Sequence, residues 1–486
     1  MTRPKRLAIV HYHLLPGGVT RVISHAATVM SQRGWSVVIL CGRDPEPYQQ
    51  FDAEVLVLKD LYYHAAMPDC AEAIAAAMLQ MATDALGGEP DVWHAHNHSL
   101  GKNAAYPAAL RILANRGHRL MLQIHDFAED SRPHDYRRLL QALGSDEQQL
   151  GRICYPIADH VHYAVLNSRD HQYITTAGLD VSRIHLLPNA VQLPMNDEVS
   201  DVDPALLLYP TRGIRRKNIG EFILWSALAE QGQRFAITLA PTKGSSERSY
   251  YDRWMVFAKR QQLPVEFEFG ACSDKSFTAL LSSASALVTT SIAEGFGLAF
   301  LEPLLVGRPV VGRNLPVITD DFSANGIDLK GLYQRLDVPI EWVGADILSR
   351  VIATALDKTY QAYGRPYNHR MIEQAIAAAV QGERVDFGHL DESMQERVIK
   401  HICQSPSESS AIRPGQLYGE GFQDASVLAN NRQIIETQYG LDGYGHRLEA
   451  AYVAIGAPSQ IHEDSHLGAK VLDTFLNPDH FLLLRA

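Results

Sequence analysis

Short runs of apolar and β-branched residues alternate with helix-length segments over the first two hundred residues. The runs are LAIVHYH (residues 7–13), WSVVILC (35–41), EVLVL (54–58), DVWHAH (91–96), RLMLQIHD (119–126), YAVLNS (163–168) and IHLLP (184–188). Between them, apolar residues recur with helical spacing, as in residues 19–33 and 69–86. Apolar strands separated by helices predict βαβ units and a parallel sheet that is covered on both faces.

The alternation stops between residues 188 and 204, in the stretch PNAVQLPMNDEVSDVDP, where prolines and acidic residues replace the apolar spacing. We interpret this stretch as a linker between domains. After it the strand-like runs return as ALLLYP, RFAITLA, ALVTTS and RPVVG, again separated by helix-length segments. The pattern therefore predicts an α/β protein with two facing doubly wound domains and parallel sheets, residues 1–198 and residues 199–365.

The chain beyond Gly364 follows a different pattern. Strand-like runs fade, and helical stretches rich in Ala and Glu are broken by the polar loop QSPSESSAIRPGQ. We expect residues 366–486 to form a mostly helical extension. The sequence does not choose among three roles for this extension: packing against the first domain, forming a contact in a homo-oligomer, or helping to close a substrate site.

The composition is that of a globular protein and narrows the choice of partners. Of the 486 residues, 46% are apolar and 20% are charged. Lys and Arg number 44 against 55 Asp and Glu, and the net charge of −11 opposes binding to nucleic acid or anionic lipid.

No run of about twenty apolar residues predicts a membrane span, and we interpret LAIVHYHLLPGG as a first strand and not as a signal peptide. The five cysteines form no C-x-x-C pair, which fits reduced thiols in the cytoplasm.

The first predicted strand runs into Pro16, Gly17, Gly18 and Val19 at the start of a predicted helix. Backbone amides and the positive end of the helix dipole favour a phosphate at such a place. A tight turn explains two adjacent glycines equally well, so this stretch is a weak signal by itself. No G-x-G-x-x-G motif follows the strand, which argues against a dinucleotide site.

Basic residues gather after the first strand of the second predicted domain. This strand ends at Arg212, and Arg215, Arg216 and Lys217 follow it. Cations at the carboxyl end of a strand, in a protein with net negative charge, suggest a clamp for an anion. The alternative is a solvated basic loop.

The most specific stretch surrounds two glutamates. The strand ALVTTS leads into EGFGL at residues 294–298, and Glu302 follows eight residues after Glu294. The glycines let a bound group approach the start of the next helix, where N–H groups favour a diphosphate. Glu302 is expected about one turn inside that helix, where a carboxylate on an apolar face needs polar partners. Sugar hydroxyls are suitable partners. The alternative, that one glutamate caps the helix and the other lies on the surface, explains each residue separately but not the apolar residues around both.

Several motifs occur in a specific order over roughly residues 7–320: GGV after the first strand, HD in QIHDFAED, PNAV before the linker, R-x4-K, and E-G-F-G-L-x3-E. This order resembles that of the retaining GT-B glycosyltransferases, in particular the large group with two glutamates spaced as E-x7-E. The resemblance departs at Ala190, where the family often has glycine, and it does not extend beyond Gly364.

The resemblance implies a role for each motif residue. Arg212 and Lys217 would hold the diphosphate of a nucleoside-diphosphate sugar, beside Gly17 and Gly18. His125 would contact the transferred sugar near the reacting carbon. Glu294 would bind hydroxyls of that sugar, and Glu302 those of the ribose. Backbone support would come from Gly295, Phe296, Gly297 and Leu298.

The activity implied by the resemblance is hexosyl transfer with retention of configuration, without a metal or another cofactor. Breaking the bond between sugar and phosphate places negative charge on the leaving diphosphate, which cations and helix amides stabilise. We expect a small polar acceptor, such as a sugar or a glycerate-type compound, because the chain lacks a basic amphipathic membrane signal.

Two groups of histidines could instead be interpreted as ligands of a metal ion. His94, His96 and His98, like His11 and His13, alternate along predicted strands and so share a face that suits a metal ion. No cysteine or acidic cluster accompanies them, and we interpret them as polar residues on the acceptor side.

Two further segments have alternative readings. Asp201 and Asp203 resemble the metal-binding acid pair of a different glycosyltransferase fold, but their place in the predicted linker indicates a solvated turn. The segment SRPHDYRRLLQAL is interpreted as a surface helix, with contact to a phosphorylated or carboxylated acceptor as the alternative.

Three other functions fit the same two-domain plan. A nucleotide-sugar epimerase would release nucleotide without an acceptor. A phosphorylase would need a phosphate site and a cofactor lysine that the sequence does not reveal. A non-catalytic sensor would bind a nucleotide sugar without turnover.

Overall fold

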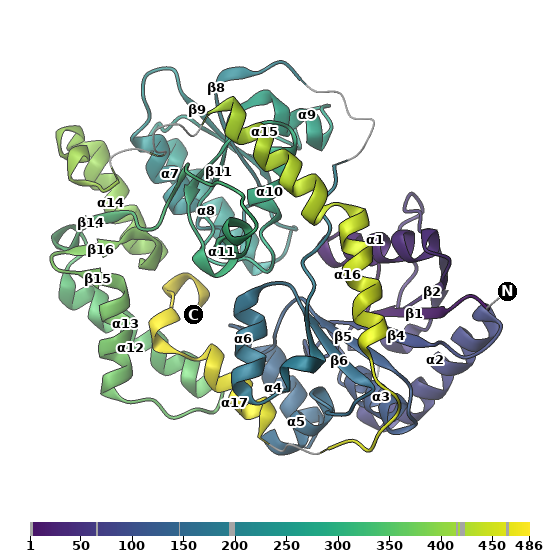
Figure 1. The fold of residues 1–486 in the computed structure, drawn as a ribbon. Helices are drawn as coiled ribbons and strands as arrows, with labels where there is room; N and C mark the ends of the chain where they lie inside the picture. Colours follow the sequence, from purple (N-terminus) through teal and green to yellow (C-terminus); the bar gives the residue numbers. More distant parts are fainter. Residues whose placement is uncertain are drawn as a thin grey trace. The chain divides into compact units, whose positions relative to one another are not determined.

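The structure, a computed structural model, describes residues 3–64, 67–144, 146–193, 200–414, 417, 423–462 and 466–486. Contacts within the chain divide it into two units (Figure 1). The first unit comprises Met1–Ala190, Ala362–Gly364 and Tyr439–Asn477. The second comprises Val191–Gln361, Arg365–Gln438 and Pro478–Ala486.

A parallel sheet of seven strands forms the centre of the first unit, in the order β3-β2-β1-β4-β5-β6-β7. Its strands are β1 (Arg6–His11), β2 (Ser36–Cys41), β3 (Glu54–Val57), β4 (Val92–His96), β5 (Leu120–Ile124), β6 (Val161–Val165) and β7 (Ile184–Leu186). Strands β4, β5 and β6 are buried throughout, as expected for a parallel sheet with helices on both faces. The loops that follow these parallel strands therefore lie along one edge of the sheet.

Different helices cover the two faces of this sheet. The helices are α1 (Gly18–Gln32), α2 (Ala71–Leu86), α3 (Ala105–Asn115), α4 (Pro133–Ala142), α5 (Glu147–Cys154), α6 (Ser168–Ala177), α16 (Leu441–Ala454) and α17 (Leu467–Phe475). Adjacent strand residues point to opposite faces, so Val10 joins the core under α2 and α3, whereas Ile9 joins the core under α1 and α16. The late helix α16 lies along α1, and α17 packs on α5 and α6 (Figure 1).

The second unit has its own parallel sheet of six strands, in the order β10-β9-β8-β11-β12-β13. These strands are β8 (Asp203–Arg212), β9 (Arg234–Leu239), β10 (Val265–Glu266), β11 (Ala284–Thr289), β12 (Val310–Arg313) and β13 (Leu332–Tyr333). A small antiparallel sheet adds β14 (Asp337–Pro339), β16 (Arg384–Asp386) and β15 (Val380–Gln381), in that order. These last strands are too short to produce a visible alternation in the sequence.

Nine helices belong wholly or mainly to the second unit among the described residues. They are α7 (Ile219–Ala227), α8 (Ser246–Arg260), α9 (Phe277–Ser283), α10 (Leu298–Leu305), α11 (Pro316–Ala324), α12 (Ala345–Ala362), α13 (His369–Ala379), α14 (Glu392–Gln404) and α15 (Ala425–Ile434). None of the helices in the described parts of the chain is long and apolar enough to cross a membrane.

The prediction of two doubly wound α/β domains with a mostly helical C-terminal segment is confirmed. The domain boundary predicted at residue 198 lies outside the described residues, because residues 194–199 are not among them. The chain from residue 366 onward contributes to both units: Tyr439–Asn477 lies in the first, and the rest lies in the second.

Candidate active site

The basic loop of the second unit begins where β8 becomes irregular. The pairing of β8 with β9 shifts register between Tyr209 and Arg212, and Pro210, which has no N–H to donate, lies within this bulge. Strand β8 ends at Arg212, and a short 3-10 helix follows at Arg215–Lys217. Asn218 then turns the chain into α7 with a left-handed φ of 49°, a conformation that asparagine tolerates better than most residues.

Neighbouring strands hold the Lys217–Asn218 turn in place. The Thr290 hydroxyl lies 3.0 Å from the carbonyl oxygens of both Lys217 and Asn218, and the Tyr209 hydroxyl donates to the Lys217 carbonyl at 3.0 Å. Thr290 directly follows β11, and Tyr209 lies in β8. The turn is thus fastened to two central strands of the sheet.

Buried charged and polar side chains also hold the Lys217–Asn218 turn. The Asn218 side chain donates to Glu221 at 2.8 Å, and Arg313 at the end of β12 donates to Glu221 at 2.6 Å and to Asp386 of β16 at 2.8 Å. Both carboxylates and the guanidinium are buried, so each charge depends on its partners. Gln395 of α14 completes the arrangement by donating to Asn218 at 2.8 Å.

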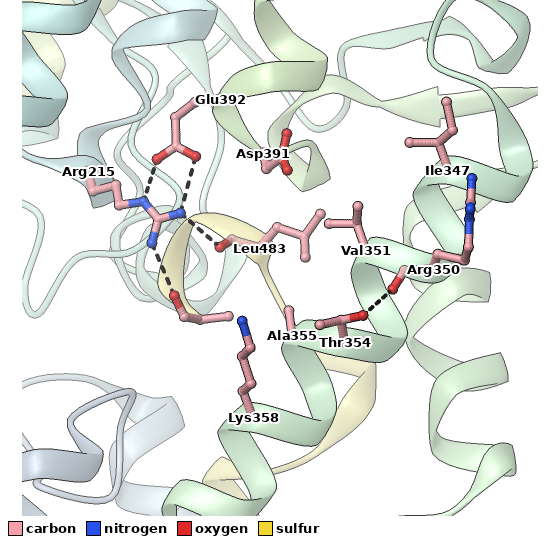
Figure 2. Close-up of a pocket in the computed structure, with 11 residues that line it drawn as sticks. Arg215, Ile347, Arg350, Val351, Thr354, Ala355, Lys358, Asp391, Glu392 and Leu483 are labelled. Atoms are coloured by element: carbon pink, nitrogen blue, oxygen red, sulfur yellow. Dashed lines mark hydrogen bonds and ion pairs between the residues drawn. The ribbon is translucent and has the colours of Figure 1, made fainter.

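Of the three consecutive cations in the loop, Arg215 has one acidic partner, and Arg216 and Lys217 share another. Arg215 forms a two-pronged ion pair with Glu392 and donates to the carbonyl oxygen of Ala486 at 3.0 Å (Figure 2). It lines a cavity of about 450 Å³, which is also lined by Arg350 and Lys358 of α12 (Figure 2). Arg216 and Lys217 instead pair with Glu294, Arg216 at 2.8 Å.

Glu294 is an ionised carboxylate inside the second unit. Its side chain is 8% exposed, and each of its oxygens has its own cation, Lys217 on Oε1 and Arg216 on Oε2. Burial raises the pKa of Glu294, but Lys217 and Arg216 outweigh it and lower this pKa to about 2. Burial also lowers the pKa of Lys217, which the negative charge of Glu294 opposes. The arrangement is a preformed group of two cations and one anion at the start of the glycine loop.

The glycine loop after Glu294 leads directly into α10. Gly297 has a φ of 92°, and a Cβ atom added to it would lie 2.7 Å from Ile318, so no other residue fits there without strain. Gly297 has no side chain to cap the helix, which leaves the amides of Leu298 and Ala299 to an anion, whereas the Phe300 amide donates to the Gly297 carbonyl at 2.9 Å. Phe296 packs against Phe322, and Glu302 is buried in the fifth position of α10.

The glycines of the first unit precede and begin α1. Gly17 has an extended backbone, with a φ of 175°, and a Cβ atom added to Gly18 would meet nothing within 4 Å. Neither backbone strain nor crowding by the protein therefore explains these glycines. The space beside Gly18 is free for a bound group.

His125 follows β5 and is held by the loop after β4. The backbone N–H of His125 donates to the Asn97 side chain at 2.7 Å, and its Nε2 lies 2.8 Å from Nδ1 of His96. Burial lowers the pKa of His125 to about 4, so its imidazole is neutral at pH 7. Asn97 itself has a left-handed φ of 54°, which no local sequence pattern reveals.

His94 of β4 and His98 in the loop after it have separate protein partners. His94 lies between Gln123 at 2.9 Å and the hydroxyl of Tyr452 at 2.7 Å, and Nε2 of His98 faces the Cys154 carbonyl at 2.7 Å. Because the Gln123 oxygen can only accept, Nε2 of His94 carries the proton and Nδ1 accepts from Tyr452. In the described parts of the chain, no three His, Cys, Asp or Glu side chains are grouped to hold a metal ion.

The structure thus brings some of the predicted residues together. Lys217 contacts Glu294, and Glu302 lies in the helix that follows the same loop. The side chain of Arg212 is exposed at the end of β8 and has no ion pair or hydrogen bond among the described residues. His125, Gly17 and Gly18 belong to the first unit. Sequence reasoning missed Arg216 as a partner of Glu294, although its place inside R-x4-K was a signal.

Sequence comparison finds similar proteins among the glycosyltransferases. Residues 17–190 match the family described as "Glycosyl transferase 4-like domain". The mannosylglucosyl-3-phosphoglycerate synthase of Petrotoga mobilis is 26% identical over 430 residues, which cover 82% of this chain and 81% of that protein.

Solved structures share the same architecture. Sucrose-phosphate synthase from Thermosynechococcus elongatus aligns over 92% of this chain and 98% of its own, with a TM-score of 0.55 and 12% identity. HepE from Anabaena, in complex with UDP and glucose, aligns over 91% and 98%, with a TM-score of 0.51 and 12% identity. The shared GT-B architecture, the family match over residues 17–190 and the Petrotoga mobilis relative together support a glycosyltransferase with the GT-B fold.

Proposed function

We propose that this glycosyltransferase moves a hexose from a nucleoside-diphosphate sugar to a small glycerate-type acceptor, with retention of configuration and without a metal ion. The observation that carries the proposal is the buried Glu294 carboxylate, paired with Lys217 and Arg216 beside the open start of α10. Such a donor requires a carboxylate that binds the hydroxyls of its sugar and cations that bind its diphosphate.

The same groups explain how the donor reacts. The diphosphate binds Lys217, Arg212 and the amides from Gly295 to Leu298, and it competes with Glu294 for the Lys217 ammonium. Glu294, relieved of part of this pairing, accepts hydrogen bonds from the hexose, while Glu302 binds the ribose. As the bond between sugar and phosphate breaks, the fixed cations stabilise the negative charge that develops on the leaving diphosphate.

His125 contacts the hexose as a neutral hydrogen-bonding group, because its lowered pKa keeps it uncharged at pH 7. Retention follows from attack on the face that the diphosphate leaves, with a phosphate oxygen taking the proton of the acceptor hydroxyl. In this scheme no side chain forms a covalent intermediate. We place the enzyme in the cytoplasm because its five cysteines are free thiols.

Two relatives support the choice of substrates. The name of the Petrotoga mobilis enzyme specifies a product that contains hexoses and a phosphoglycerate, and this enzyme aligns with most of the present chain. HepE, which shares the fold, has been solved with UDP and glucose. A nucleotide-sugar donor and a glycerate-type acceptor are therefore the first compounds to test.

The test combines a donor screen with one matched pair of variants. Nucleoside-diphosphate hexoses are compared by the rise they cause in the melting temperature, since a ligand of the native state stabilises it. Hexose transfer from the best donor is then measured for the wild type, with and without EDTA, and for Glu294→Gln and Glu341→Gln. Glu341 is an exposed glutamate of the same unit and serves as the control.

We expect Glu294→Gln to lower kcat/KM by at least about tenfold, the loss of one charge-assisted hydrogen bond, and Glu341→Gln to leave it unchanged. EDTA should not lower turnover, and the anomeric configuration of the product should equal that of the donor. Equal activity of the two variants, or loss of turnover in EDTA, contradicts the proposal.

A further inference from the structure

A group of basic side chains lies on the first unit and includes none of the residues assigned to the donor. Lys102 forms an ion pair with Asp135 at 2.6 Å, and Arg138 forms a second one with the other oxygen of Asp135 at 3.2 Å. The side chains of Lys102 and Arg138 are 30% and 43% exposed, whereas that of Asp135 is 11% exposed. One inner carboxylate thus holds two outer cations, and the group keeps a positive charge.

His64 extends this group. Its backbone N–H donates to the Lys102 carbonyl at 2.7 Å, and its side chain is exposed. Partial burial lowers the pKa of His64, and the nearby charges of Arg138 and Lys102 lower it further. These three side chains, Lys102, Arg138 and His64, are called the cationic cluster below.

The fold places the cationic cluster at the ligand-binding edge of the sheet. Lys102 lies in the loop after β4, His64 lies after β3, and Arg138 lies in α4, which follows β5. Loops after the strands of a parallel sheet share the carboxyl edge, where such folds bind ligands. The loop of Lys102 begins with Asn97, whose side chain also accepts from the backbone N–H groups of His125 and Asp126.

The loops that carry the cationic cluster are fixed without a ligand. The buried Asn103 side chain donates to the carbonyl oxygens of Asp60 at 2.6 Å and Tyr62 at 2.8 Å, which ties the loop of His64 to that of Lys102. Gly101 has a φ of 82°, and a Cβ atom there would lie 2.4 Å from the Asp135 carbonyl oxygen, so this loop lies directly against α4. The two cations of these ion pairs stay partly exposed, so a ligand in solvent can reach them.

A hydroxyl that is free to donate lies next to His64 in the sequence. Nδ1 of His13 accepts from the Leu15 N–H at 3.3 Å, so Nε2 of His13 carries the proton and donates to the Tyr63 hydroxyl at 3.0 Å. The proton of Tyr63 is then available for a carboxylate or hydroxyl of a ligand.

We propose that the cationic cluster binds the phosphate group of the acceptor, and that Tyr63 donates to its carboxylate or hydroxyl. The proposal rests on the proposed function and assigns its acceptor to a chemical class, that of small phosphorylated acids. It also gives a role to SRPHDYRRLLQAL and to His13, which the donor site does not use. Phosphate suits the cluster because three oxygens can accept from two cations and an imidazole at once.

Binding is measured by titration calorimetry with 3-phosphoglycerate, glycerate and inorganic phosphate. The variants are Lys102→Gln, Arg138→Gln and, as the matched control, Arg137→Gln, which removes an exposed arginine from the neighbouring position of α4. Each test variant leaves Asp135 with its other cation, so no unpaired carboxylate is created. Release of nucleotide from the donor without acceptor is recorded in parallel.

We expect the wild type to bind 3-phosphoglycerate at least about tenfold more tightly than glycerate, as a charge-assisted hydrogen bond provides. Lys102→Gln and Arg138→Gln should each remove most of this preference, while Arg137→Gln should keep it. Inorganic phosphate should bind more weakly than 3-phosphoglycerate, because it does not reach Tyr63. Nucleotide release without acceptor should be the same in all variants.

Equal affinity for glycerate and 3-phosphoglycerate, or equal behaviour of Arg138→Gln and Arg137→Gln, overturns the proposal. Phosphate binding as tight as that of 3-phosphoglycerate also overturns it, because the site would then select the free anion. A failure of the proposed function is recognised separately, since no donor would then raise the melting temperature or lose its hexose.

Discussion

Glu129 shows how strongly burial acts on a single residue of the first unit. It lies four residues after His125, and its Oε1 accepts from the Tyr155 hydroxyl at 2.9 Å, while Oε2 has no partner among the described residues. Burial raises the pKa of Glu129 to about 7. The protonated acid is therefore the form that the folded interior favours.

The consequence is a dependence of stability on pH. Because the pKa of Glu129 is higher in the folded protein than in the unfolded chain, its contribution to stability is complete below the unfolded pKa of 4.5 and is lost as pH rises through about 7. We expect Glu129→Gln, which stays neutral, to gain about 3 kcal/mol in free energy of unfolding relative to the wild type between about pH 4 and pH 8. Urea unfolding across this range measures the difference. A constant difference, like that expected for the exposed Glu54→Gln, contradicts this assignment.

At the scale of elements, the two glycine turns have different physical causes. Gly297 is required by its own chain, because its φ of 92° and the nearby Ile318 leave no room for a side chain. Gly18 has open space around it and an ordinary place at the start of α1. The sequence alone gives both turns the same appearance.

A pair of alanine substitutions separates these causes. Gly297→Ala should lower the free energy of unfolding by about 1–3 kcal/mol, the usual cost of a strained backbone position. Gly18→Ala should change stability by less than about 0.5 kcal/mol but raise KM for the donor, since its methyl group occupies space that we assign to the phosphates. Chemical unfolding and donor kinetics on both variants provide the test. Unchanged donor kinetics in Gly18→Ala would remove this glycine from the site.

The sequence predicts the features that neighbouring residues determine. It does not predict the features that depend on contacts between residues far apart in the chain. Strand and helix alternation, the glycine turn before α10 and the depth of Glu302 in that helix all follow from neighbouring residues. The pairing of Arg313 with Glu221 and Asp386 does not, because its members lie far apart in the chain. The same holds for Tyr452, which reaches His94 from α16. The pattern of a single sequence reveals the spacing of apolar residues in strands and helices. It does not reveal which distant residues contact one another.

At the scale of the whole molecule, the late helix α16 is part of the core of the first unit. Tyr444, Leu448 and Tyr452 join the same buried cluster as Ile9 and Ile23. Residues more than four hundred positions apart thus form one hydrophobic interior.

This arrangement predicts the effect of a cavity in the tail. Leu448→Ala should lower the free energy of unfolding by about 2–5 kcal/mol, as is typical for a fully buried leucine. Val453→Ala on the same helix should have little effect, because Val453 is 62% exposed. Equal effects of the two substitutions would show that α16 contributes no core to the first unit.

The late return of the chain to the first unit also affects its biosynthesis. The ribosome makes the strands and six helices of this unit before Ala190 but delivers α16 and α17 only with Tyr439–Asn477. At roughly 5–20 residues per second, the first unit waits on the order of tens of seconds without α16 and α17, and the core residues that these helices cover stay exposed. We therefore expect translation speed and holdase chaperones to influence the yield of this enzyme in cells more than they would for a protein whose N-terminal half folds alone.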